Sequence, residues 1–389
     1  MSPRTLVVTN DYPPRPGGIQ AFVHQLAVRQ PPGDVVVYAP AWRGAARFDA
    51  GLSYPVIRHP TSLMLPTADV ARRAIQIAAA EGCEVVWFGA AAPLGLLAPT
   101  LRRGAGLRRT VASTHGHEVG WAMLPGARQL LRAVGAANDV VTYLGGYTHR
   151  RLAPALGAHP RLVRLPSGVD THAFRPGAGG AEIRAAYRLG ARPVVVCVSR
   201  LVPRKGQDTL VRALPAIRRR VPGTALLVVG GGPYRATLER LAREQDVARH
   251  VVVTGSVPWA RLPAHYDAGN VFAMPCRTRR AGLEVEGLGI VYLEASATGL
   301  PVVAGDSGGA PDAVLAGRTG HVVNGRDIRA VVDAVAGLLE DPERAREMGE
   351  QGRSWVDQVW HWDGLAARLG AVLAGERVTA ALPGLGQVL

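Results

Sequence analysis

The segment Arg277–Gly299, RTRRAGLEVEGLGIVYLEASATG, is the part of the chain from which the rest is best interpreted. It begins as a basic, glycine-containing turn and continues into Ile290–Thr298, whose residues predict a helix that ends at Gly299-Leu300-Pro301. A new strand is expected directly after that stop. The turn at Gly287–Gly289 leaves backbone N–H groups free at the start of the helix, and such groups favour an anion.

Glu286 and Glu294, two of the acidic residues of this segment, have seven residues between them. Glu294 falls about one turn inside the predicted helix, where its neighbours are apolar. A carboxylate in apolar company needs hydrogen-bond partners. Hydroxyl groups of a sugar or a ribose would supply them.

The chain has 389 residues, of which 48% are hydrophobic, and this length predicts two domains, each with its own core. No apolar run is long enough to span a bilayer. The first strand-like run, Thr5–Thr9, follows no charged and apolar leader, so we expect an intracellular protein. Cys83, Cys197 and Cys276 are far apart in apolar settings, which predicts reduced packing residues and no metal site.

The formal net charge is +15 and the isoelectric point about 10.8, which indicates an anionic partner. Nucleic acid, a phosphorylated substrate and an acidic membrane surface all fit this charge. The basic residues are dispersed and aromatic residues make up only 5%, so we expect no nucleic-acid binding. Lys205 is the only lysine among 45 basic residues.

Short β-branched runs alternate with segments of helix length, and this pattern predicts two doubly wound α/β domains with parallel sheets. The break between them is expected in the Pro- and Gly-rich segment Pro166–Gly180. The predicted strands are Thr5–Thr9, Val35–Tyr38, Val85–Phe88, Thr110–Thr114, Val140–Tyr143, Val194–Ser199, Ala225–Val229, Val251–Thr254, Val271–Met274 and Pro301–Ala304.

In such a fold ligands bind at the carboxyl ends of the strands. Gly17-Gly18 follows the first strand, where it either lets a phosphate approach the backbone or simply forms a turn. His115 and His117 follow the fourth strand. A zinc site, a contact to a substrate hydroxyl and a purely structural role all remain open for the two histidines.

Two further segments carry positive charge. Arg200, Arg204 and Lys205 lie within six residues at the end of a strand, which suits a diphosphate and the charge of a departing phosphate. In Gly120–Val134 the apolar residues alternate with arginines. That segment is either interfacial or an ordinary helix packed on its own sheet.

Taken together, these motifs resemble the retaining GT-B glycosyltransferases, the large family that includes sucrose synthases and glycogen synthases of bacterial type. The chain most resembles the actinobacterial, GDP-mannose-dependent branch that adds the second, α-1,6-linked mannose to phosphatidylinositol monomannoside. The segments that carry this resemblance are NDYPPRPGGIQ, WFGAAAPL, STHGHEVGWAMLPGARQ, LPSGVD, SRLVPRKGQD and GLEVEGLGIVYLEA.

The resemblance implies two Rossmann-like domains that face a central cleft. Residues 1–170 would form the acceptor domain and residues 171–357 the nucleotide-sugar domain, and a last helix at about 358–376 would return to the first domain. Arg279-Arg280-Ala281 departs from the family pattern, in which glycine is more usual.

The resemblance also implies roles for single residues. The catalytic set is His115, Arg200, Lys205 and Glu286. The donor-binding set is Gly17, Gly18, Arg200, Lys205, Val257, Glu286, Gly289, Ile290 and Glu294. The acceptor or membrane face is expected at Trp121, Arg128 and Arg132, with the Ser62–Pro66 turn as a second candidate.

No carboxylate pair of the glycosidase kind and no Asp-x-Asp motif is present. We therefore expect transfer with retention that needs no metal or other cofactor, with domain closure to exclude water. The basic charge predicts a protein that binds the inner face of the plasma membrane peripherally. The alternatives are another nucleotide sugar or acceptor, a nucleotide-sugar epimerase or phosphorylase on the same fold, or a non-catalytic nucleic-acid binder.

Overall fold

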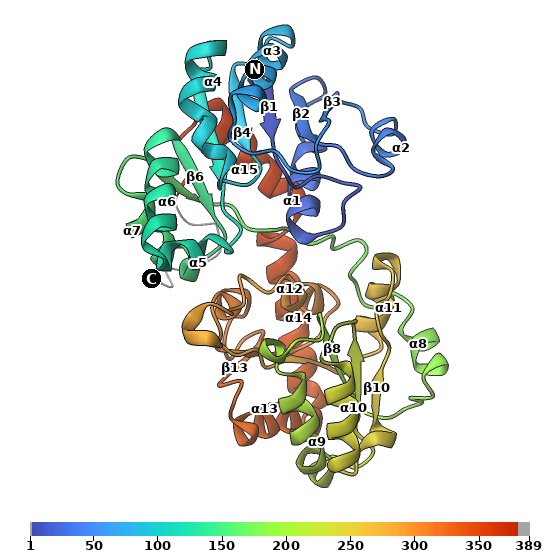
Figure 1. The fold of residues 1–389 in the computed structure, drawn as a ribbon. Helices are drawn as coiled ribbons and strands as arrows, with labels where there is room; N and C mark the ends of the chain where they lie inside the picture. Colours follow the sequence, from blue (N-terminus) through green and yellow to red (C-terminus); the bar gives the residue numbers. More distant parts are fainter. Residues whose placement is uncertain (1, 380–389) are drawn as a thin grey trace. The chain divides into compact units, whose positions relative to one another are not determined.

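A computed structural model describes residues 2–379 and divides the chain into two compact units (Figure 1). The first unit contains the chain up to Gly168 and the segment that begins at Trp362, and the second contains Val169–His361. The division after Gly168 falls inside the segment Pro166–Gly180. Each unit holds one parallel sheet with helices, so the predicted α/β class with two Rossmann-like sheets is confirmed.

The first unit has a seven-stranded sheet in the order β3-β2-β1-β4-β5-β6-β7. Its strands are β1 Thr5–Val8, β2 Val35–Pro40, β3 Val56–His59, β4 Val85–Phe88, β5 Arg109–Ser113, β6 Val140–Tyr143 and β7 Arg161–Arg164. All neighbouring strands pair in parallel. The order reverses between β1 and β4, and the loops that follow these two strands flank that reversal.

Helices complete the first unit. They are α1 Gly18–Ala27, α2 Ala45–Asp49, α3 Ala68–Ala80, α4 Ala98–Ala105, α5 Glu118–Met123, α6 Pro125–Ala137, α7 Gly146–Leu156 and α15 Trp362–Ala374. α15 comes from the end of the chain and packs on α1 and β5 (Figure 1). The side chain of Gln30 donates a hydrogen bond to the Ala366 carbonyl, with an N–O distance of 3.2 Å.

The second unit has a six-stranded parallel sheet in the order β10-β9-β8-β11-β12-β13, which reverses between β8 and β11. The strands are β8 Val194–Val198, β9 Ala225–Val229, β10 Val251–Val253, β11 Val271–Met274, β12 Val302–Gly305 and β13 Gly320–Val323. The helices are α8 Gly180–Ala186, α9 Gln207–Arg220, α10 Arg235–Glu244, α11 Leu262–Asp267, α12 Ile290–Ala297, α13 Ile328–Glu340 and α14 Pro342–Val359.

All ten predicted strands are present; four have the predicted bounds, and the ends of the others shift by one or two residues. Three observed strands were missed: β3, β7 and β13. Each lies at the edge of its sheet, where partial exposure lets charged or small residues replace the continuous apolar run of a central strand such as β8. The three cysteines are free and buried, as predicted.

The segment Gly120–Val134 contributes to two helices. α5 ends before Leu124, whose extended backbone (φ −105°, ψ 126°) precedes Pro125 at the start of α6. The residue before a proline avoids the helical region, which explains the break. Across residues 2–379, no helix is long and apolar enough to cross a membrane.

Candidate functional site

The loops at the strand-order reversal of the second unit bring together three charged residues. Lys205 ends a short 3₁₀ turn, Pro203–Lys205, that follows β8. Its Nζ donates to Oε2 of Glu286 at 2.5 Å, and Nη1 of Arg204 donates to the same oxygen at 2.9 Å. Ligands of doubly wound sheets bind at this reversal. Two of the predicted catalytic residues, Lys205 and Glu286, are therefore in direct contact there.

The Glu286 carboxylate and Lys205 are buried, whereas Arg204 is partly exposed. Burial alone would raise the pKa of Glu286, but the charges and hydrogen bonds of Lys205 and Arg204 outweigh it and lower the pKa overall. The carboxylate is therefore ionised. One negative charge faces two positive charges, so the cluster has a surplus of positive charge for an anion.

The glycine loop after β12 supports Glu286. A Cβ on Gly308 would lie 2.1 Å from the Glu286 carbonyl oxygen, and one on Gly309 would lie 2.1 Å from the Gly287 carbonyl oxygen. The Gly309 N–H also donates to the Glu286 carbonyl at 2.8 Å. These glycines allow a close backbone contact that orients the Glu286 segment.

Glu294 projects from α12, as predicted. Its Oε2 accepts a hydrogen bond from the Tyr266 hydroxyl at 2.6 Å. The residue as a whole is partly exposed, yet desolvation by burial is the largest effect on its carboxyl. That effect raises the pKa of Glu294 to about 7 against the lowering effect of the Tyr266 hydrogen bond. A carboxyl group with one such hydrogen bond can accept further hydrogen bonds from hydroxyl groups of a ligand.

Gly289 and Ile290 lie at the start of α12. Gly289 caps the helix with φ 82°, and a Cβ there would lie 2.4 Å from the Tyr292 ring. The fold thus requires glycine at this position whether or not a ligand binds. The N–H of Ile290 lies at the N-terminus of α12, directly after Gly289. The sequence predicted an anion site at this helix start.

Arg200 and Val257 follow the strands β8 and β10. Arg200 is exposed after β8, and Val257 is partly exposed after β10. Among the described residues, neither side chain has a hydrogen bond or ion pair with Lys205 or Glu286. Arg200 was predicted to contact the diphosphate and Val257 the base. Both roles remain predictions.

The turn at Arg279–Ala281, where the sequence departs from the family, has an unusual backbone. Arg280 and Ala281 have φ values of 49° and 50°, in the left-handed region. Residues other than glycine pay a cost there. Backbone pairing between Arg279 and Glu284 holds the turn, with Arg279 N donating to the Glu284 carbonyl at 2.9 Å.

In the first unit, Gly17-Gly18 leads from the β1 loop into α1. A Cβ on Gly17 would lie 2.0 Å from Oε1 of Gln20, whose Nε2 donates to Asp11 at 2.7 Å. A Cβ on Gly18 would meet nothing within 4 Å. The fold therefore explains a glycine at position 17 but not at position 18.

His115 lies beyond the end of β5 and reaches the loop after β4. Its Nε2 is 2.6 Å from the Gly89 carbonyl oxygen. A carbonyl can only accept, so Nε2 carries the proton. Burial lowers the pKa of His115 despite the nearby Glu118 carboxylate, which keeps the ring neutral. Nδ1 is then a hydrogen-bond acceptor suited to a hydroxyl group.

Glu118 is a residue of this region to which the sequence analysis assigned no role. It is fully buried, and its Oε2 accepts a hydrogen bond from the His115 backbone N–H at 3.0 Å. Its Oε1 lies 3.5 Å from Nε2 of the exposed His117, whose ring stacks on that of His115. The sequence feature that could have identified Glu118 is its position directly after His-Gly-His. Across residues 2–379, no group of three or more His, Cys, Asp or Glu side chains could hold a metal ion.

The predicted acceptor or membrane residues lie on α5 and α6. Trp121 is partly exposed and packs on the core of its unit, while Arg128 and Arg132 are exposed. Large apolar side chains are exposed beside them: Met123 by 40%, Leu124 by 57% and Leu130 by 45%. The surface thus combines arginine with exposed apolar groups.

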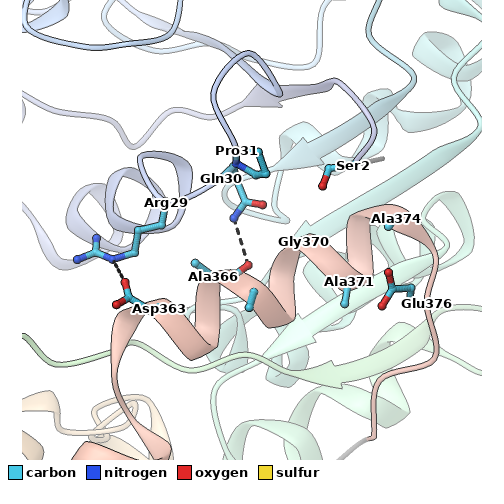
Figure 2. Close-up of a pocket in the computed structure, with 11 residues that line it drawn as sticks. Ser2, Arg29, Gln30, Pro31, Asp363, Ala366, Gly370, Ala371, Ala374 and Glu376 are labelled. Carbon is cyan, nitrogen blue, oxygen red and sulfur yellow. Dashed lines mark hydrogen bonds and ion pairs between the residues drawn. The ribbon is translucent and has the colours of Figure 1, made fainter.

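A pocket of about 670 Å³ lies elsewhere in the first unit, between α15 and the turn after α1 (Figure 2). Small residues of α15 line it, and Arg29 pairs with Asp363 at its rim at 2.8 Å. It lies where the chain enters β1 and β2, opposite the carboxyl ends at which such sheets bind ligands. It contains none of the predicted site residues.

Comparisons with known proteins agree with these features. Residues 16–173 match the family model "Glycosyltransferase Family 4", and residues 181–355 match "Glycosyl transferases group 1". The GDP-mannose-dependent α-(1-6)-phosphatidylinositol monomannoside mannosyltransferase of Mycolicibacterium smegmatis is 57% identical over 96% of this chain and 98% of its own. A Corynebacterium glutamicum enzyme, named as acting on the monoacylated acceptor, is 47% identical over 96% of this chain and 99% of its own.

Solved structures show the same fold at low sequence identity. Anabaena Alr3699/HepE in complex with UDP aligns with a TM-score of 0.81 at 18% identity, covering 96% of this chain and all of that one. WaaG, a glycosyltransferase involved in lipopolysaccharide biosynthesis, aligns with a TM-score of 0.64 at 19% identity, covering 95% and 100%. The chain belongs to the family 4 glycosyltransferases and has the GT-B fold.

Proposed function

We propose that this glycosyltransferase transfers mannose from GDP-mannose to phosphatidylinositol monomannoside with an α-1,6 linkage, with retention of configuration and without a metal ion. The observation that carries the proposal is the similarity, along nearly the whole chain, to enzymes with this donor and acceptor. The charge and hydrogen-bonding geometry of the site support it.

The donor diphosphate would lie against the cationic loop after β8. Lys205 and Arg204 already outnumber the single carboxylate of Glu286, and the exposed Arg200 adds a third cation on the same loop. Fixed cations stabilise the charge that develops on a departing diphosphate without rearrangement during the reaction. Glu294, with its raised pKa and Tyr266 partner, would accept hydrogen bonds from the ribose hydroxyls.

Residues of each unit are proposed to contact the donor sugar. Nδ1 of His115 would accept a hydrogen bond from a sugar hydroxyl, because Nε2 is committed to Gly89. Glu286 would lie beside the sugar ring. Gly18, whose Cβ position is open, would allow the backbone to approach the donor closely.

The reaction would proceed on one face of the sugar. The bond between the anomeric carbon and the diphosphate oxygen breaks, the acceptor hydroxyl oxygen bonds to that carbon from the same side, and its proton passes to the departing diphosphate. Because Glu286 is ionised and held by two cations, it is a weak nucleophile and base. Its proposed role is to orient and to stabilise positive charge on the sugar.

The acceptor side would dock on an anionic membrane. Residues 119–169 include six arginines and one acid, Asp139, which is paired with Arg102. The six are Arg128, Arg132, Arg150, Arg151, Arg161 and Arg164. Each basic group near an anionic leaflet contributes about 1 kcal/mol, so a few suffice for reversible binding.

Calorimetric titration with GDP, UDP, GDP-mannose and UDP-glucose tests the donor assignment, first with a chelator and then with Mg²⁺. We expect selective binding of GDP and GDP-mannose that Mg²⁺ does not strengthen. A mannosyl-transfer assay with phosphatidylinositol monomannoside in vesicles follows. Preference for a UDP sugar would overturn the donor assignment, and release of an altered nucleotide sugar without acceptor would indicate an epimerase.

A further inference from the structure

Asn10 links two parts of the first unit that are distant in sequence. It is buried two residues after the end of β1, and its side-chain amide both donates to and accepts from the backbone of Met64. Nδ2 of Asn10 donates to the Met64 carbonyl at 2.9 Å, and the Met64 N–H donates to Oδ1 of Asn10 at 2.7 Å. The side-chain amide thus binds both the N–H and the carbonyl of Met64, as the backbone of a neighbouring strand would.

The turn that Asn10 holds exposes two leucines. Met64 is fully buried, whereas Leu63 is 54% and Leu65 is 52% exposed. Two further hydrogen bonds stiffen the turn: Oγ1 of Thr61 donates to the Leu63 carbonyl at 2.8 Å, and the Thr67 N–H donates to the Leu65 carbonyl at 2.7 Å. The two leucines are therefore presented to the outside by a turn whose centre is anchored.

On its other side, Asn10 begins the loop that ends at Gly17-Gly18. The Asp11 N–H donates to Oγ1 of Thr9 at 2.9 Å, and Nε2 of Gln20 donates to the Asp11 carboxylate at 2.7 Å. This loop is therefore tied both to the end of β1 and to the first turn of α1. Together with the intervening backbone, these hydrogen bonds link the turn of the exposed leucines to the first turn of α1, which begins at Gly18.

We propose that Asn10 is a positioning residue that fixes Leu63 and Leu65 as an apolar contact with the acyl-chain region of the bilayer that carries the lipid acceptor. The proposal rests on the proposed function and deepens it. Leucines that enter the acyl chains contribute binding free energy through burial. Asn10 sets their place relative to Gly18, where the donor sugar is proposed to lie, so the acceptor sugar meets the donor at a defined depth.

The test compares Asn10→Ala with Asn138→Ala. Asn138 is a matched control because it is also buried in the first unit and its Nδ2 donates to two carbonyls, those of Val134 and Gly95. Binding to vesicles of phosphatidylglycerol and phosphatidylcholine is measured by co-sedimentation. KM is measured for phosphatidylinositol monomannoside in vesicles and for its deacylated form.

For Asn10→Ala we expect vesicle affinity to fall and the ratio of the lipid KM to the deacylated KM to rise about tenfold, as two lost hydrogen bonds would allow. Asn138→Ala should leave that ratio unchanged even if it lowers thermal stability. Asn10→Asp keeps the acceptor for the Met64 N–H but loses the donor, so it should fall between wild type and alanine.

Leu63→Ser/Leu65→Ser should weaken vesicle binding in the wild-type background and add little in the Asn10→Ala background, because both changes act on one contact. Equal vesicle affinity of wild type and Asn10→Ala, or fully additive effects, would overturn the inference. Absence of GDP-mannose binding or of transfer by the wild type would instead overturn the proposed function, and the vesicle measurements would still decide the role of Asn10.

Discussion

Lys205 and Glu286 form a buried ion pair, with Nζ and Oε2 2.5 Å apart, between the loops that follow β8 and β11. The pair joins the only lysine of the chain to the acid that lies eight positions before Glu294. Arg204 shares the same carboxylate oxygen, so Lys205 can turn toward an incoming diphosphate while Glu286 keeps a cationic partner.

Lys205→Ala should lower turnover by about 100-fold or more, because it removes a fixed cation from the proposed leaving-group site. Loss of one partner from a buried pair is usually costly, but Arg204 remains on Glu286. We therefore expect a cooperative melting transition that is shifted without loss of the fold. Steady-state kinetics with GDP-mannose and calorimetric unfolding measure the two effects, and near-normal turnover in a folded variant would exclude this role of Lys205.

Glu294→Gln should separate stability from ligand binding. The amide keeps an oxygen for the Tyr266 hydroxyl but cannot be charged. We expect the variant to be more stable than wild type at pH 8, by up to about 3 kcal/mol from the pKa difference, and to bind GDP more weakly because a charged acceptor for the ribose hydroxyls is lost.

The pH dependence of this effect follows from the pKa of Glu294, which burial raises from its ordinary value of 4.5 to about 7 in the folded protein. Between these values the folded protein keeps a proton that the unfolded chain has released. The contribution of Glu294 to stability is therefore fully present below pH 4.5 and is lost as the pH rises through 7. Denaturant unfolding at a series of pH values should show the wild-type and Glu294→Gln curves diverging above pH 5, and parallel curves would contradict the assignment.

Gly18→Ala should impair catalysis without harming the fold. The new Cβ would enter open space, and alanine is the better helix former at the first residue of α1. We expect an unchanged or higher melting temperature together with a raised KM for GDP-mannose. Gly17→Ala is the contrasting variant, since its Cβ would meet the anchored Gln20 side chain, and it should lower stability. Normal kinetics of Gly18→Ala would show that no ligand approaches this position closely.

Much of the fold could be predicted because central parallel strands such as β8 and β9 are continuous apolar runs. Three of the four edge strands could not. β3, for example, carries Arg58 and His59 and pairs on one side only, whereas the edge strand β10 is an apolar run and was predicted. Lys205 was identified because it is the only lysine of the chain, and Glu286 because of its spacing from Glu294 in the sequence.

The partners of these residues depend on tertiary structure. Tyr266, which donates to Glu294, lies 28 residues away in sequence, and nothing local marks it. Glu118 was missed for a related reason. Its contact with the His115 backbone appears only when the chain turns sharply after β5, and its complete burial is decided by the surrounding core.

Arg128→Ser/Arg132→Ser should weaken binding to anionic vesicles by about tenfold or more, because each arginine near the surface contributes about 1 kcal/mol. The effect should shrink as salt is raised, since screening already weakens the wild-type interaction. Arg212→Ser/Arg219→Ser removes the same charge from exposed positions on α9 of the second unit and serves as the control. If both pairs reduced binding equally, net charge alone would account for it and the α5–α6 surface would have no special role. Unchanged binding of the Arg128/Arg132 variant would place the membrane contact elsewhere on the protein.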